Sequence, residues 1–222
     1  MDRMFLRILV GLAVSFWMAP AHAATRTWGG TSNGDWFDST KWVESLVPVG
    51  GDVVSVSAGS ILLTNSTEYL ESLTITNATI TFTNFTTALQ ATNVIIQSNG
   101  KFQHVVCVTN GALTYTNRIY VLCSNLDVNV GGLIDANSSG FTGRFANAGI
   151  GPGAGEAPGG TGIYGGGGSY GGKGGFGSGT LLGGPVYGSA DTPLQPGSSG
   201  GAGQGSGGNG GGAIWIEATG TV

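Results

Sequence analysis

A short alternation of apolar and polar residues recurs along the first half of the chain. Each copy reads apolar-x-apolar-x-x-small-x-apolar, and four copies are present: VSVSAGSI (54–61), LTITNATI (73–80), VCVTNGAL (106–113) and LDVNVGGL (126–133). Such alternation is typical of a strand with one buried face, and the small residue permits a sharp corner before the next strand. The pattern predicts stacked short strands with the following apolar positions inside: Val56, Ile75, Val108 and Val128.

The spacing of these copies favours a right-handed parallel β-helix, a coiled β-solenoid, over residues 53–148. Repeats of about 20 residues that reuse one template are typical of solenoids, whereas a β-sandwich has short strands without a common template. A looser copy, IIQSNGKF (95–102), contributes Ile95, Gly100 and Phe102. The interval from Leu73 to Val106 is longer than the others, so either some coils carry insertions or the register differs there.

Residues 1–23 have the pattern of a Sec-type signal peptide. Arg3 and Arg7 precede an apolar run over residues 8–18, and Ala21-His22-Ala23 forms a small-x-small cleavage site. The apolar run is shorter than the ~20 residues that a membrane-spanning helix needs, which disfavours a membrane anchor. We therefore expect cleavage after Ala23 and export of a mature chain without a membrane-spanning segment, to the extracellular space or the outer cell surface.

Residues 24–52 are rich in turn-forming residues and contain Trp28, Trp36 and Trp42. A solenoid needs protected ends, because open strand edges invite aggregation. Tryptophan buries a large area, so the three indoles are predicted to form an N-terminal cap over the core. The alternative is an exposed aromatic platform for sugar rings.

Residues 149–212 form a glycine-rich insertion in which nearly half of the residues are glycine. Within GIYGGGGSYGGKGGFGSG (162–179) every third residue is glycine, and three aromatic residues recur in one register: Tyr164, Tyr170 and Phe176. A period of three matches the polyproline II helix, in which a bare glycine edge lets another segment approach closely. The pattern predicts an ordered polyproline/polyglycine II-like insertion, with the aromatic residues as surface contacts or anchors. The alternative is a flexible linker.

The glycine stripe makes a specific expectation about substitutions. Alanine should be excluded at Gly168 and Gly171, which lie on the stripe, and tolerated at Gly166 and Gly167, which lie off it. After the insertion, residues 213–222 (AIWIEATGTV) return to strand-like alternation. They are predicted to be the resumed strand of a truncated solenoid that belongs to a longer protein.

Composition limits the possible partners. Only 9% of the residues are charged and the formal net charge is −4, while 40% are hydrophobic. The apolar content favours a packed core over disorder. The chain has no basic patch that could neutralise phosphates, so nucleic acid is excluded as an expected partner.

Few residues suggest catalysis or metal binding. The carboxylate pairs considered for polysaccharide cleavage are Asp127 with Asp135 and Glu68 with Glu71, but each is also an ordinary exposed position. His104 is the single histidine after the signal peptide. Together with the two cysteines it gives too few ligands for the usual four-ligand Cys/His zinc site. We expect no enzymatic activity, no cofactor and no metal.

The two cysteines, Cys107 and Cys123, leave two alternatives open. In an exported protein a pair can form a disulfide. They can equally be two buried thiols on neighbouring strands, because free cysteine packs as a small hydrophobic residue.

Two segments resemble known material. TWGGTSNGDWFDSTKWVESLVPVGGDVVSV resembles the start of passenger-type β-helix modules in large secreted bacterial surface proteins, as in autotransporter-associated repeat proteins. The segments GGGGSYGGKGG, GGPVYGSADTPLQPGSSGG and GGNGGGAIWIEATGTV are similar to glycine-rich modules in giant secreted proteins of the planctomycete and verrucomicrobial kind. The resemblance implies β-helix coils around a glycine-rich insertion, and it supplies no catalytic residue.

These observations lead to two functional expectations. The first is a non-catalytic structural or adhesive module of an exported bacterial cell-surface protein, with extracellular glycans or other cell-surface proteins as partners. The alternative is a carbohydrate-binding or polysaccharide-degrading extracellular β-helix protein.

Overall fold

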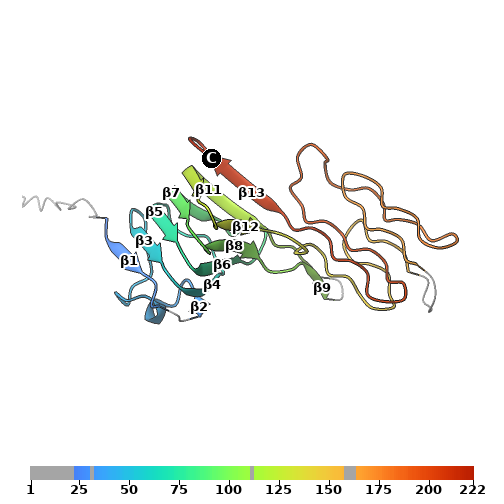
Figure 1. The fold of residues 1–222 in the computed structure, drawn as a ribbon, viewed down its shortest axis with the longest axis horizontal. Coiled ribbons are helices and arrows are strands. Elements are labelled where there is room, and N and C mark those ends of the chain that lie inside the picture. Colours follow the sequence, from blue (N-terminus) through green and yellow to red (C-terminus); the bar gives the residue numbers. More distant parts are fainter. Residues whose placement is uncertain (1–22, 31–32, 111–112, 158–163) are drawn as a thin grey trace, which may run out of the picture.

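The computed structural model describes residues 23–30, 33–110, 113–157 and 164–222. Figure 1 shows an elongated molecule, with the strands gathered at one end and the glycine-rich chain at the other. One short 3-10 helix, Ser39–Lys41, is present among these residues, so the all-β prediction is confirmed. Within this described part, no helix is long and apolar enough to cross a membrane.

Two parallel sheets contain most of the strands. The first has the order β1 (Thr25–Thr27), β3 (Val53–Val56), β5 (Leu70–Ile75), β7 (Leu89–Ile96), β11 (Ile119–Val128), β13 (Ile214–Ala218). The second has the order β12 (Leu133–Asp135), β8 (Lys101–His104), β6 (Ala78–Phe82), β4 (Gly59–Leu63), β2 (Gly34–Asp35). From β3 to β8 the chain alternates strictly between the sheets, so each pair of strands stacks on the preceding pair.

The register stacks equivalent template positions. Val54 pairs with Leu73 and Val56 with Ile75 in the first sheet, while Gly59 pairs with Ala78 in the second. In the looser copy, Phe102 pairs with Ile80 and is buried as the template predicts, but the first strand is shifted by one residue from the prediction. Val94 and Ile96 pair with Leu73 and Ile75 and are buried, whereas Ile95 pairs with Thr74 and is only partly buried.

The corners between the sheets are also stacked. Asn77 and Asn99 have positive φ angles of 49° and 56°, a conformation that asparagine tolerates better than most residues. The Asn99 side-chain amide donates a hydrogen bond to Asn77 Oδ1 at 3.0 Å. A side-chain hydrogen bond therefore links the corner at Asn77 to the corner at Asn99 that is stacked next to it.

Burial confirms part of the predicted core. Ile75 is 0% exposed and Val56 is 1% exposed. The prediction was wrong for Val108 and Val128, which are 39% and 47% exposed. Val108 begins β9 (Val108–Asn110), which pairs antiparallel with β10 (Leu113–Tyr115) outside the two sheets. Val128 ends β11, where β13 covers only Ile119–Cys123.

The N-terminal tryptophans are fully inside. Trp28, Trp36 and Trp42 belong to the main hydrophobic cluster, and Trp42 makes edge-to-face contacts with the other two at 5.0 and 4.9 Å between centroids. The Trp42 indole donates a hydrogen bond to Trp36 O at 2.8 Å. Because the three rings are buried, they form no platform for sugars.

A carboxylate fixes the entry of the chain into the first sheet. Asp52 accepts hydrogen bonds from the Arg26 side chain at 2.8 Å and from the backbone amides of Val49 at 3.0 Å and Ala24 at 3.2 Å. Burial alone would raise the pKa of Asp52, but the Arg26 and amide hydrogen bonds outweigh it and the pKa is lowered. The carboxylate therefore remains ionised in the folded protein well into the acidic range.

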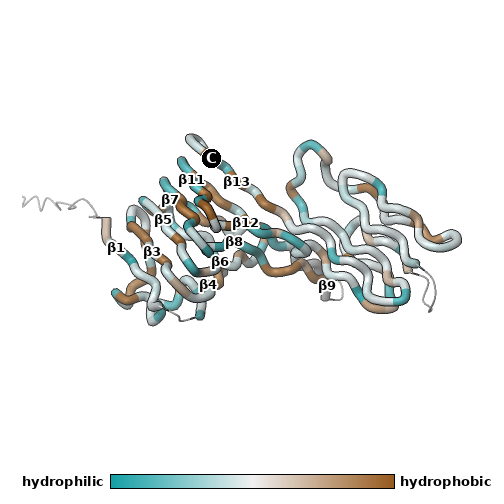
Figure 2. The backbone as a smooth tube through the Cα atoms, viewed as in Figure 1, coloured by the Kyte–Doolittle hydropathy of each residue, from teal (hydrophilic) through white to brown (hydrophobic). Residues whose placement is uncertain are grey.

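The glycine-rich residues form a packed bundle of chain segments that run back and forth beside the sheets (Figure 1). Figure 2 shows this bundle as mostly pale, whereas the strands alternate between hydrophobic and hydrophilic residues. Backbone hydrogen bonds join the bundle. Residues 164–170 are linked in this way to four other segments, through pairs that include Gly166 N–Glu156 O at 2.8 Å, Gly167 N–Gly175 O at 2.8 Å, Gly184 N–Gly167 O at 3.0 Å and Gly201 N–Gly166 O at 2.8 Å.

Glycine contacts in the bundle repeat every three residues. A Cβ at Gly165 or Gly168 would collide with backbone of the 198–202 segment, and a Cβ at Gly174 or Gly177 would collide with backbone of the 164–168 segment. A Cβ at Gly171 would lie 2.7 Å from the backbone of Ala190. The close approach predicted for the described part of the stripe is present; Gly162 lies outside the described residues.

The predicted tolerance off the stripe was wrong for Gly166. A Cβ there would collide with the carbonyl group of Leu182, because another segment packs on this side as well. At Gly167 the nearest atom would be Gly175 N at 3.0 Å. Other segments pack against residues 164–168 on more than one side, so glycine is required at more positions than every third residue.

Candidate functional site

Two of the three predicted contact aromatics lie on the surface. Tyr164 and Phe176 are each 70% exposed, and Lys173 Nζ lies 5.3 Å from the Phe176 ring centroid. Their segments are neighbours, since Ser178 N donates to Tyr164 O and Tyr164 N donates to Ser178 Oγ, at 2.8 and 2.9 Å. This edge of the bundle therefore presents two rings and one cation to solvent.

Tyr170 has a different role from the other two. Its ring packs edge-to-face on Tyr187 with 5.0 Å between centroids, and its hydroxyl accepts a hydrogen bond from Gln195 N at 3.2 Å. The side chain is partly buried. Tyr170 is an anchor within the bundle that also lines a groove described below.

Cys107 and Cys123 are both free and buried, in separate hydrophobic clusters. Cys107 Sγ accepts a hydrogen bond from Asn117 N at 3.3 Å, while Cys123 lies on β11 in the main core. Burial raises the pKa of both thiols. The structure thus has no Cys107–Cys123 disulfide and corresponds to the alternative of two buried thiols.

The carboxylates considered for catalysis lie on strands and in a loop. Asp127 lies on β11 and Asp135 on β12, in different sheets. Glu68 accepts a hydrogen bond from Gly50 N at 2.6 Å and so holds the loop that contains Gly50. In the described part of the chain, no three or more His, Cys, Asp and Glu residues lie close enough together to hold a metal ion.

His104 joins two distant parts of the chain. Its Nδ1 lies 2.8 Å from Val105 O, and its Nε2 accepts a hydrogen bond from Ala213 N at 3.2 Å. This pattern requires the neutral ring with the proton on Nδ1. Burial lowers the pKa of His104, and the hydrogen bond with Val105 O opposes that effect. The residue has a structural role at the return of the chain from the glycine-rich bundle.

A cluster that the sequence did not reveal lies where β11 and β13 meet the bundle. Arg118 immediately precedes β11, Tyr120 lies on β11 and pairs with Trp215 of β13, and Phe85 comes from the loop between β6 and β7. Ile119 and Val121 are fully buried. Strand alternation therefore places Tyr120 on the opposite, outer face of the sheet.

The Arg118 guanidinium lies between aromatic rings. Its Cζ is 4.2 Å from the Phe85 centroid, 4.4 Å from the Tyr120 centroid and 5.1 Å from the Trp215 centroid. Burial lowers the pKa of Arg118, and the nearby Tyr120 and Glu217 oppose that effect. Stacking on ring faces attracts the cation electrostatically and leaves the edge of its plane for hydrogen bonding.

Arg118 lacks a counter-charge at close range. Among the described residues the only ion pair within 4.0 Å is Arg26–Asp52, and Arg118 Nε is buried without a hydrogen-bond partner. Glu217 is the nearby carboxylate, but its Oε1 accepts hydrogen bonds from the Tyr120 hydroxyl at 2.8 Å and the Trp215 indole at 2.6 Å. The hydrogen bonds of this carboxylate are therefore made with the two aromatic residues, and it forms no ion pair with Arg118 within 4.0 Å.

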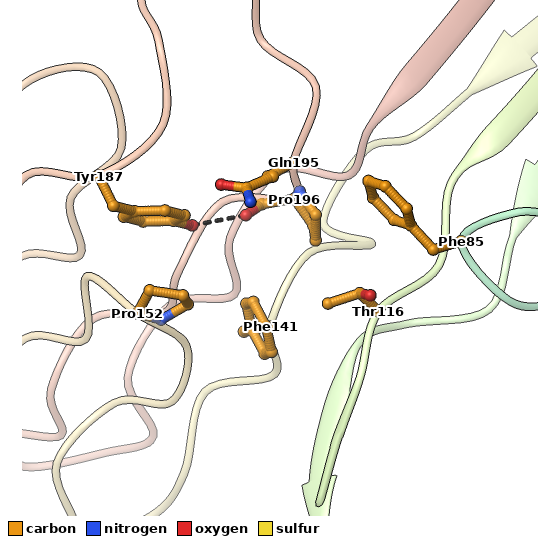
Figure 3. A pocket seen from close by; sticks show the side chains of 7 residues that line it. All are labelled: Phe85, Thr116, Phe141, Pro152, Tyr187, Gln195 and Pro196. Atoms are coloured by element: carbon orange, nitrogen blue, oxygen red, sulfur yellow. Dashed lines mark hydrogen bonds between the residues drawn. The ribbon is translucent and has the colours of Figure 1, made fainter.

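Three adjoining pockets run along the junction between the sheets and the bundle. The first, of about 150 Å³, is shown in Figure 3, with Phe85 and Thr116 on the strand side and Pro152 and Tyr187 on the bundle side. A second, of about 350 Å³, shares Phe85 and Gln195 with the first. It is lined by Phe85, Arg118, Tyr170, Gly188, Ser189, Thr192, Leu194 and Gln195.

A third pocket, of about 420 Å³, continues from the second through the shared residues Tyr170 and Gln195 and reaches Ile214 at the start of β13. We call the three together the junction groove. The lining residues include one cation, Arg118, and no aspartate or glutamate. The groove therefore combines aromatic faces, neutral polar groups and a single positive charge.

Comparisons of the chain with models of protein families, with curated proteins and with solved structures gave no match. The resemblance to passenger-type β-helix modules thus remains a prediction from the sequence, and the geometry of the junction groove and the bundle is what bears on function.

Proposed function

We propose that the chain is a non-catalytic structural or adhesive module of an exported bacterial cell-surface protein. In this proposal the two parallel sheets are the walls of a right-handed β-helix, and the bundle is a polyproline/polyglycine II-like insertion. Parallel strands joined by crossovers are right-handed in nearly all known cases, which supports that handedness. The stacked register of β3, β5 and β7 supports the solenoid.

The observation that carries the proposal is the three-residue period of the glycine contacts. A helix with three residues per turn presents every third residue to the same neighbour, as Gly165 and Gly168 do toward one segment and Gly174 and Gly177 toward another. Ordering glycine is entropically costly. An ordered bundle with exposed rings at Tyr164 and Phe176 suits a rigid element that displays contacts at a distance from the sheets.

Adhesion can be tested with protein-coated beads. Beads carrying residues 24–222 should attach to intact bacterial cells or to immobilised extracellular glycans, and the double variant Tyr164→Ser/Phe176→Ser should attach less. Leu182→Ser is a matched control, because Leu182 is a 46% exposed apolar residue elsewhere on the bundle. Beads that attach to neither surface would contradict the adhesive role.

A second function, carbohydrate binding, is favoured by a separate observation. The junction groove brings aromatic rings, an arginine and neutral polar side chains together, and binding sites for small polar ligands commonly combine an apolar lining with a few placed polar groups. The polysaccharide-degrading version is less well supported, because the groove lining contains no carboxylate pair.

A further inference from the structure

We propose that the junction groove binds a hexuronate residue within an acidic extracellular polysaccharide, and that Arg118 holds the carboxylate of the sugar. The inference names the ligand class of the carbohydrate-binding role proposed above and rests on that role. The residues that carry it come from three separate parts of the chain: Phe85, Arg118 with Tyr120, and Tyr170 with Ser189, Thr192 and Gln195.

Arg118 is a cation without an ion pair among the described residues. Its guanidinium stacks on Phe85 and Tyr120, its Nε is buried without a partner, and the described residues place no carboxylate within 4.0 Å of it. Arg118 as a whole is partly buried, and both a partly desolvated cation and a buried donor without a partner are costly unless paired. A ligand carboxylate is the group that matches the planar fork of donors on arginine.

Glu217 is the nearby carboxylate, but it does not form an ion pair with Arg118 within 4.0 Å. Tyr120 and Trp215 both donate to its Oε1 atom, so the carboxylate is stabilised on the outer face of β13. Two of the rings near Arg118, those of Tyr120 and Trp215, are thus also the donors to this carboxylate. Glu217 acts on Arg118 electrostatically but forms no ion pair with it within 4.0 Å, so the guanidinium keeps donors for an external anion.

The size and the lining of the second pocket favour a sugar over a small anion. The second pocket has a volume of about 350 Å³ and is lined by Ser189, Thr192 and Gln195 together with the rings of Phe85 and Tyr170. The polar side chains can hydrogen bond to hydroxyl groups while the aromatic rings cover the apolar face of a sugar ring. A lone carboxylate or phosphate would fill little of that space.

The two adjoining pockets favour a sugar that belongs to a polymer. The pocket beside Arg118 adjoins the other two, since it shares Phe85 and Gln195 with the first and Tyr170 and Gln195 with the third. Adjoining pockets leave room for neighbouring sugars of an extended chain, whereas an isolated closed cavity would accept only a monosaccharide.

The test is calorimetric titration of residues 24–222 with trigalacturonate. The matched neutral probe is the galactose trimer of the same linkage, and acetate is the probe for a bare carboxylate. We expect trigalacturonate to bind at least about tenfold more tightly than either, which corresponds to 1.4 kcal/mol. Equal binding of acetate would overturn the sugar assignment, and equal binding of the neutral trimer would overturn the role of the carboxylate.

Variants locate the site. Arg118→Gln should weaken trigalacturonate binding at least about tenfold, and Gln195→Ala should weaken it as well. Lys101→Gln makes the same change of charge on β8, outside the groove, and should leave binding unchanged. Thermal unfolding of each variant shows whether it is folded. If Arg118→Gln and Lys101→Gln are both folded and bind like the parent, the proposal is wrong.

The result also separates this inference from the adhesive role. Beads that attach to cells while the protein ignores trigalacturonate would refute the hexuronate site and leave adhesion in place. Trigalacturonate binding that needs Arg118, together with beads that attach to neither cells nor immobilised glycans, would support the site and refute adhesion.

Discussion

The Nε2 atom of His104 accepts a hydrogen bond from the backbone amide of Ala213, which lies 109 residues later in the chain. This contact fixes the point where the chain returns from the glycine-rich bundle and enters β13. A Cβ on the neighbouring Gly212 would collide with the same imidazole nitrogen. The return therefore depends on a neutral imidazole and on a residue without a side chain.

Acidification should weaken the fold through His104. Its folded-state pKa lies below the ordinary value of 6.5 because of burial. The unfolded chain therefore takes up the proton first, and the stabilisation present above about pH 6.5 is lost as the pH falls from there through the folded-state value. Thermal unfolding of residues 24–222 between pH 8 and pH 5 should show this fall. His104→Gln should flatten the profile over this range; an unchanged slope would assign the effect to other groups.

Adjacent glycines in the bundle should respond oppositely to alanine. At Gly174 a Cβ would collide with the carbonyl oxygen of Gly167, whereas at Gly175 nothing lies within 4 Å. We expect Gly174→Ala to lower the free energy of unfolding by about 1–3 kcal/mol. Gly175→Ala should leave it unchanged or raise it by up to about 1 kcal/mol through the unfolded chain.

Denaturant unfolding of the two variants measures this difference. Gly210 and Gly211 provide a repeat of the comparison in another segment, since a Cβ at Gly210 would collide with Gly197 O and one at Gly211 would meet open space. Equal stabilities within both pairs would show that the bundle is loosely packed in solution.

A charge in the stacked core should unfold the sheets. Ile75 on β5 is 0% exposed, so Ile75→Asp buries an unpaired carboxylate and should cost at least about 4 kcal/mol. The adjacent Thr74→Asp points to the other face of the same strand and should cost far less. Circular dichroism melting curves compare the two, and a melting temperature for Ile75→Asp equal to that of Thr74→Asp would refute the burial.

The two cysteines should be present as protected thiols. A thiol reagent should label neither Cys107 nor Cys123 in the folded protein, because both are buried and burial raises the pKa of each thiol. In denaturant without reductant both should be labelled. Labelling of neither cysteine in denaturant would instead indicate a disulfide, and mass spectrometry of the labelled protein distinguishes these outcomes.

The strands could be predicted from the sequence because successive pairs of strands reuse a local pattern. Leu73 and Ile75 align with Val54 and Val56 by the same alternation that buries them. The prediction failed at VCVTNGAL (106–113), which fits the template by composition. Its Asn-Gly dipeptide is a hairpin signal in the sequence, and β9 and β10 pair antiparallel outside the stack.

The junction groove could not be read from the sequence in the same way. Arg118 and Tyr120 lie beside Trp215 only because β13 pairs with β11 after the chain has passed through the whole bundle. No repeat spacing links these positions. The glycine period did predict which described residues approach a neighbouring backbone, but it could not show that Gly166 is enclosed as well, since that depends on where a third segment packs.

The hydrogen bond from Ala24 N to Asp52 Oδ1, at 3.2 Å, has a consequence for maturation. Cleavage after Ala23 would convert this amide into a terminal ammonium group, because an α-amino group has a pKa of about 7.7–8.0. The Asp52 carboxylate, already paired with Arg26, would then hold two cations at the start of the first sheet. Removal of the leader would thus add an ion pair that the precursor lacks, and the processed chain would be more stable than the precursor.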